Sequence, residues 1–167
     1  MSVLAPAVGA VIAAILESSV LTHLQMGDIR PDLVFAVGIA LAMVLGFERG
    51  MTWAFVGGVS LDLLLPGRPL GATALTMVLA TGVALLVARA TWPPRLLVIV
   101  GTSLVLSPAY QLLVLGLLSL TQDVAFSGLS PADLFFSALL NALVTSIAVV
   151  AVRAIDLRFG EPERLAW

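Results

Sequence analysis

Six apolar stretches separated by short polar segments run along the chain of 167 residues. They cover residues 3–24, 31–48, 49–66, 69–89, 95–120 and 132–153. A helix that crosses the hydrocarbon core of a bilayer needs about 20 mostly apolar residues. The pattern therefore predicts an all-α integral membrane protein, in which residues 1–167 form one domain, a bundle of six transmembrane helices.

The second and third stretches leave an alternative open, because both have roughly 18 residues, near the lower limit for a spanning helix. Gly46 and Gly50 bracket the charged pair Glu48 and Arg49, which favours a tight turn between two crossing helices. In the alternative, the segment 49–66 is re-entrant and only five helices cross. We favour six crossings with a turn near residues 48–50.

The positions of the basic residues predict an orientation. With six crossings, one side of the membrane carries Arg49, Arg89, Arg95, Arg153, Arg158 and Arg164, and the other carries Arg30 and Arg68. Cytoplasmic loops carry an excess of basic residues, so both termini are expected in the cytoplasm. Trp53 and Trp92 are expected at the cytoplasmic interface, and the tail after residue 153 along the inner surface.

Charged side chains within or near the outer half of the membrane are candidates for a functional role. Glu17 and Asp62 lie inside the apolar stretches, and Arg30, Asp32 and Arg68 form an outer charge cluster at their ends. A carboxylate at the centre of a membrane helix costs about 2.5–3.5 kcal/mol on insertion scales. We expect Glu17 or Asp62 to pair with Arg30 or Arg68, the alternative being that each reaches water alone.

Small residues recur at helical spacing in two stretches. One row contains Gly50, Ala54, Gly57, Gly58 and Asp62, and the other contains Gly9, Ala13 and Glu17. Such rows let helices approach closely in lipid. One interpretation is packing within the bundle. The other is docking of a transmembrane helix of another protein, for which these eight residues are the candidate binding residues.

The sequence offers no recognisable catalytic set. It has no Cys, no HExxH zinc motif and no Gly-rich phosphate loop, and His23 is its single histidine. Its formal net charge is −2, without the basic stripe of a nucleic-acid-binding protein. The polar residues Tyr110, Gln111, Asn141 and Thr145 are expected to make interhelical hydrogen bonds. We therefore expect a non-enzymatic bundle without cofactor, metal or nucleic acid.

A sequence resemblance covers residues 31–75. This region reads Pro31-Asp32-Leu33, then an apolar stretch, then residues 57–64 (GGVSLDLL), and then Pro69-Leu70-Gly71. It resembles the MreD family, the rod shape-determining membrane proteins of bacteria, which also have about six short-looped membrane helices.

The resemblance implies a multi-pass protein of the bacterial inner membrane without catalytic activity. Its implied partner is MreC, together with RodA, a class B penicillin-binding protein and MreB, in the elongasome that builds lateral peptidoglycan. An alternative resemblance is to the substrate-binding S components of energy-coupling-factor vitamin transporters. These are also six-helix bundles, and a small-residue row such as Ala10 and Ala14 would dock their partner.

Overall fold

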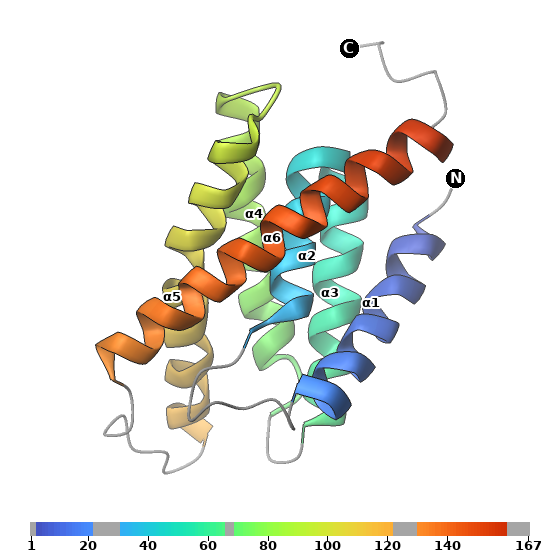
Figure 1. The fold of residues 1–167 in the computed structure, drawn as a ribbon. Helices are drawn as coiled ribbons and strands as arrows, with labels where there is room; N and C mark the ends of the chain where they lie inside the picture. Colours follow the sequence, from blue (N-terminus) through green and yellow to red (C-terminus); the bar gives the residue numbers. More distant parts are fainter. Residues whose placement is uncertain (1–2, 22–30, 66–68, 122–129, 160–167) are drawn as a thin grey trace.

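Six α-helices and one π-helical turn make up the regular structure of the computed structural model, which describes residues 3–21, 31–65, 69–121 and 130–159 (Figure 1). The elements are α1 (Leu4–Leu16), η1 (Glu17–Leu21), α2 (Leu33–Leu45), α3 (Phe47–Leu64), α4 (Ala72–Ala90), α5 (Leu96–Thr121) and α6 (Pro131–Phe159). Every regular element in these ranges is helical, which confirms the all-α prediction for the described part of the chain.

The turn between α2 and α3 lies earlier than predicted. A single residue, Gly46, separates the two helices, and Glu48 and Arg49 belong to the start of α3. Gly46 has a φ of 90°, a conformation that a residue without a Cβ adopts at little cost. The prediction of a turn near residues 48–50 was wrong because the glycine that reverses the chain precedes the charged pair.

Helix α6 continues past its predicted end at residue 153 to Phe159, so residues 154–159 are helical. The position of the tail along the inner surface stays a prediction. Two contacts hold this extension. The Arg153 Nη2 donates a hydrogen bond of 2.9 Å to the Pro94 carbonyl, and Arg49 lies 3.9 Å from the Asp156 carboxylate. The extension is also rich in Ala, Leu, Ile and Arg, which suit a helix.

Helix α2 occupies the interior of the bundle. It packs against α3, α4, α5 and α6, and nine of its 13 residues are buried. In Figure 1, α6 runs diagonally across it. A helix that is apolar all round is typical of such a buried position. Thirteen residues span about 20 Å, so α2 is shorter than the hydrocarbon core of a bilayer.

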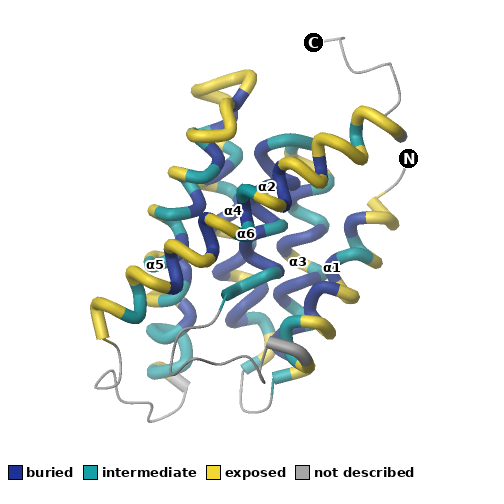
Figure 2. Tube along the Cα trace, viewed as in Figure 1, coloured by how far each residue is buried: buried dark blue, intermediate teal, exposed yellow. Residues whose placement is uncertain are grey.

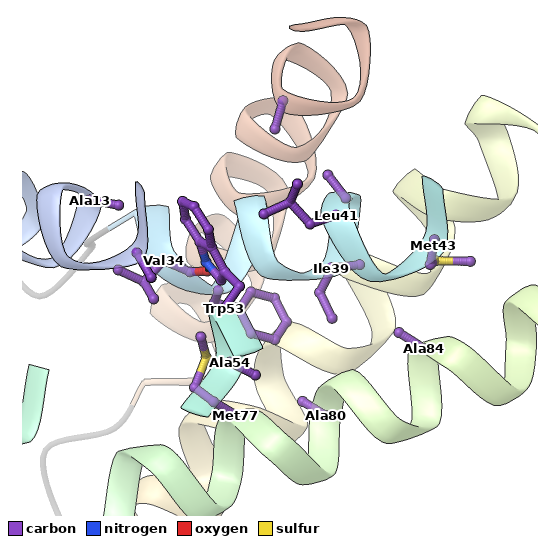
Figure 3. Packing of buried hydrophobic residues seen from close by; sticks show 14 of the residues in the cluster. Ala13, Val34, Ile39, Leu41, Met43, Trp53, Ala54, Met77, Ala80 and Ala84 are labelled. Carbon is purple, nitrogen blue, oxygen red and sulfur yellow. The ribbon is translucent and has the colours of Figure 1, made fainter. Parts of the chain in front are cut away.

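The core around α2 contains two aromatic contacts. Phe35 stacks on Tyr110 with ring centroids 4.8 Å apart. The buried Trp53 indole donates its Nε1–H to the Val34 carbonyl at 2.9 Å, as the close view shows (Figure 3). Trp53, which was expected at the cytoplasmic interface, is thus buried and finds its acceptor inside the bundle, and its depth in a membrane stays a prediction. Trp92, in contrast, is 63% exposed.

The exposed surface of the bundle is more apolar than that of a water-soluble protein. Many aliphatic and aromatic side chains are exposed, among them Leu4, Leu97 and Phe135. Figure 2 shows the exposed positions along α1, α5 and α6. The buried residues include nine polar or charged ones, namely Asp62, Thr73, Thr76, Thr81, Ser103, Ser107, Ser137, Asn141 and Thr145. Water-soluble folds rarely expose large contiguous apolar surfaces.

Three helices in the described ranges, α4, α5 and α6, are long and apolar enough to cross a membrane. Helices α1 and α2 have 13 residues each, and α1 gains a further turn through η1. Helix α3 has 18 residues, but Glu48, Arg49 and Asp62 make it less apolar than the other three.

Candidate functional site

The small-residue row of α3 lies at the closest helix contacts in the bundle. A Cβ added to Gly50 would lie 2.6 Å from the Ala42 Cα of α2, and one added to Gly58 would lie 2.4 Å from the Ala74 Cα of α4. Ala54, between them, is fully buried. The backbones of the three helices therefore touch along this row.

The row of α1 packs in the same way against α3. A Cβ on Gly57 would lie 3.6 Å from the Ala10 Cβ, and one on Gly9 would lie 2.9 Å from the Trp53 ring. Ala13 is also buried. Packing within the bundle is thereby confirmed for both rows. Helices of the same chain cover the α3 row, whereas Gly9 and Glu17 of the α1 row are half-buried. Docking of a partner helix on these residues stays a prediction.

Asp62 caps the N-terminus of α4 from the neighbouring helix α3. Its carboxylate accepts hydrogen bonds from the backbone N–H groups of Gly71 (2.8 Å), Thr73 (3.1 Å) and Ala74 (3.4 Å). Gly71, the N-cap residue, has a φ of 95° and no side chain with which to cap the helix itself. Unsatisfied N–H groups and the helix dipole make this end a favourable place for a negative charge.

The surroundings of Asp62 bear on the two interpretations proposed for its charge, which were pairing with an arginine and reaching water alone. Its side chain is only 4% exposed, so the alternative in which it reaches water alone was wrong. Backbone N–H groups at the start of α4 donate hydrogen bonds to the carboxylate. The predicted pairing with Arg68 concerns a residue outside the described ranges.

Glu17 has the same role toward α2. It lies at the start of η1, and its Oε2 accepts the Val34 N–H at 2.8 Å. This bond joins the end of the first helix to the first turn of α2, so the carboxylate satisfies one of the free N–H groups there. The predicted pairing of Glu17 with Arg30, and His23 itself, fall outside the described residues.

Asn141 joins α6 to α2 and α5. Its Oδ1 accepts the Asp32 N–H at 2.7 Å, and its Nδ2 donates to the Ser107 Oγ at 2.7 Å and to the Asp32 carboxylate at 3.3 Å. Gln111 of α5 donates to the same carboxylate at 3.4 Å. Asp32, from the predicted outer charge cluster, thus lies at a junction of three helices.

A second pair continues this polar contact one turn further along α5 and α6. The hydroxyls of Ser103 and Thr145 lie 2.7 Å apart, and Thr145 also donates to the Asn141 carbonyl. The predicted interhelical hydrogen bonds are therefore confirmed for Gln111, Asn141 and Thr145. Every buried side-chain nitrogen or oxygen in the described ranges has a hydrogen-bond partner.

The candidate site is thus the end of the bundle where Glu17, Asp32 and Asp62 hold the beginnings of α2 and α4. Sequence reasoning singled out the three carboxylates but missed that those of Glu17 and Asp62 bind helix N-termini. The carboxylate of Asp32 instead accepts hydrogen bonds from the Gln111 and Asn141 side chains. The available signal was Gly71, a helix start whose first residue has no capping side chain. The described residues contain no group of three His, Cys, Asp or Glu placed to hold a metal ion.

This chemistry is that of a structural junction, because the hydrogen-bonding capacity of the carboxylates is directed at backbone and side-chain groups of the same chain. Comparisons with family models, with curated proteins and with solved structures found no match for the chain.

Proposed function

We propose that the chain is a multi-pass protein of the bacterial inner membrane, with six crossings and both termini in the cytoplasm. The many exposed aliphatic side chains of the bundle support this, since lipid suits them and water does not. Helix α3 is one uninterrupted helix of 18 residues, which favours a crossing over a re-entrant segment. The shorter α2 fits a membrane because other helices surround it.

Labelling of single cysteines tests this topology, and the natural chain has no Cys to interfere. Exposed Ala90 and Ala132 lie at opposite ends of the bundle, and each tolerates a small side chain. In intact spheroplasts, an impermeant maleimide is expected to label Ala132→Cys and to leave Ala90→Cys unlabelled until the membrane is opened. The opposite pattern, or extraction of the chain without detergent, would contradict the topology.

For the cellular role, we propose an MreD-like scaffold without catalytic activity. It would hold MreC against the synthase pair of RodA and a class B penicillin-binding protein, with MreB on the cytoplasmic side. The observation that carries the proposal is that two of the three segments of the resemblance are joined by a hydrogen bond. Asp62 from the 57–64 segment binds the Gly71 N–H of the Pro69-Leu70-Gly71 segment, and Asp32 of the first segment begins α2.

The small-residue row of α3 is buried, which limits the surfaces that a partner helix could contact on this proposal. It would contact outward faces, such as that of α1 with the exposed Val8, Ile12 and Ile15. The vitamin-transporter alternative relied on a docking row at Ala10 and Ala14. Both residues are fully buried, so that alternative loses its main support.

Co-purification tests the scaffold proposal. When the tagged chain is expressed with the MreC of the same genome and solubilised in mild detergent, we expect MreC to be retained in near-stoichiometric amounts. A matched pair, Ile12→Trp on α1 and Leu79→Trp on α4, keeps the core intact because both side chains are about half exposed. We expect only the α1 variant to reduce retention.

A chain that is folded but retains no MreC would contradict the scaffold proposal. A tightly bound vitamin, identified by mass spectrometry of the purified chain, would support the transporter alternative instead.

A further inference from the structure

We propose that Arg89, Arg95 and Arg153 bind the head group of an anionic phospholipid of the inner leaflet. The inference rests on the proposed membrane location, but it does not depend on MreC. It concerns the opposite end of the bundle from Glu17 and Asp62, at the connection between α4 and α5.

The three arginines lie in or beside the connection between α4 and α5, as the chain positions of two of them and a hydrogen bond of the third show. Arg89 lies in the last turn of α4, and Arg95 directly precedes α5. Arg153 of α6 donates its Nη2 to the Pro94 carbonyl at 2.9 Å, which places its guanidinium beside the same connection. Three helices thus bring positive charge to a segment that lies at one end of the bundle and is largely exposed (Figure 2).

Within the part of the chain that the structure describes, none of these three arginines has an ion pair with an acidic side chain. Within the described ranges, the recorded ion pair at this end joins Arg49 to Asp156, and neither Arg89 nor Arg95 has an ion pair or hydrogen bond. Arg153 uses its recorded bond on a carbonyl, which is neutral. A guanidinium has five N–H donors in a planar fork that fits two phosphate oxygens. The cluster therefore has donors and charge available for a phosphate.

The neighbouring side chains favour a lipid phosphate over a soluble anion or an acidic protein segment. Trp92 is 63% exposed in the same connection, and indole rings favour the membrane–water interface. Leu86 of α4 and Leu97 of α5, 65% and 82% exposed, continue from it along the bundle. A phospholipid has a charged head group for the arginines and acyl chains for these leucines.

Native mass spectrometry of the full chain tests the proposal after reconstitution into phosphatidylcholine vesicles with or without a quarter of phosphatidylglycerol. We expect wild type to retain phosphatidylglycerol selectively. Each surface arginine contributes about fivefold to anionic-lipid binding, so Arg89→Gln with Arg95→Gln should reduce retention roughly twentyfold. This double variant leaves the Arg153 hydrogen bond intact, and circular dichroism verifies its fold.

The control is Arg158→Gln, which removes one charge from the same end of α6. Arg158 lies five residues after Arg153 and so about 140° around the helix. We expect the Arg158→Gln variant to retain most of the phosphatidylglycerol that wild type retains. Equal retention of both lipids by wild type, or unchanged retention by the double variant, would overturn the proposal.

Competition with soluble anions distinguishes a lipid head group from free phosphate or an acidic peptide as the ligand. Inorganic phosphate or an acidic peptide that displaces the lipid at micromolar concentration would overturn the choice of a lipid. A chain that binds MreC but no anionic lipid would refute this inference alone, whereas failure of the cysteine labelling would refute the membrane location first.

Discussion

Replacing Gly58 with alanine is expected to lower the free energy of unfolding by about 3 kcal/mol, the upper part of the range for overpacking a core. The new Cβ would lie 2.4 Å from the Ala74 Cα and 2.7 Å from its nitrogen. Both atoms belong to the backbone of α4, so no side-chain rotation relieves the contact. Helices α3 and α4 must move apart, which also draws the start of α4 away from Asp62.

Gly116→Ala is the matched control, because a Cβ there would have no neighbour within 4 Å. Both variants gain helix propensity when alanine replaces a helical glycine, and this gain stabilises the folded state by about 1 kcal/mol at most. Stability is measured by titrating dodecyl maltoside micelles with SDS and following tryptophan fluorescence, to which the buried Trp53 contributes. If the two variants unfold at the same SDS fraction, the close contact of α3 with α4 is refuted.

Replacing Asp62 with alanine is expected to have an effect of similar size, about 3 kcal/mol. A hydrogen bond to a charged group contributes about 1.5–3 kcal/mol, and the loss of an acceptor leaves buried donors unsatisfied. Three backbone N–H groups, those of Gly71, Thr73 and Ala74, lose their acceptor in this variant. Asp62→Asn keeps one carboxamide oxygen, so we expect it to lose about half as much.

Asp133→Ala is the control for Asp62, since it removes a carboxylate from the first turn of α6, where the side chain is only partly buried. The interaction of the Asp133 carboxylate with the dipole of α6 contributes about 0.3–1 kcal/mol. Hydrogen exchange gives a local measurement, because the amides of residues 71–74 are expected to exchange faster only in the Asp62 variants. Equal stability losses at the two positions would contradict the capping role.

The sequence was sufficient to locate the helices, because membrane helices follow from the length of apolar stretches alone. All six predicted stretches contain a helix, and α5 begins and ends within one residue of its prediction. The errors at Gly46 and at the end of α6 have a common origin. Hydropathy marks where charge begins, whereas a helix ends where the backbone changes direction or loses its contacts.

The partners of the polar residues could not be predicted, because they depend on which helices are neighbours. Asp62 binds groups nine to 12 residues away, and Asn141 binds Asp32 across 109 residues. Small-residue rows are likewise ambiguous, since the same spacing serves a helix of the same chain or of another protein. The burial of Trp53 could not be predicted for the same reason, as its acceptor, the Val34 carbonyl, lies on α2.

The enclosed position of α2 has a consequence for biosynthesis. The ribosome makes α2 early, yet part of its cover is α6, the last helix to emerge. Until then its polar first turn, with Asp32, lacks the Asn141 amide that later binds it. On the proposed membrane location, the nascent chain must therefore keep this helix sheltered, beside the translocon or an insertase, until translation is almost complete.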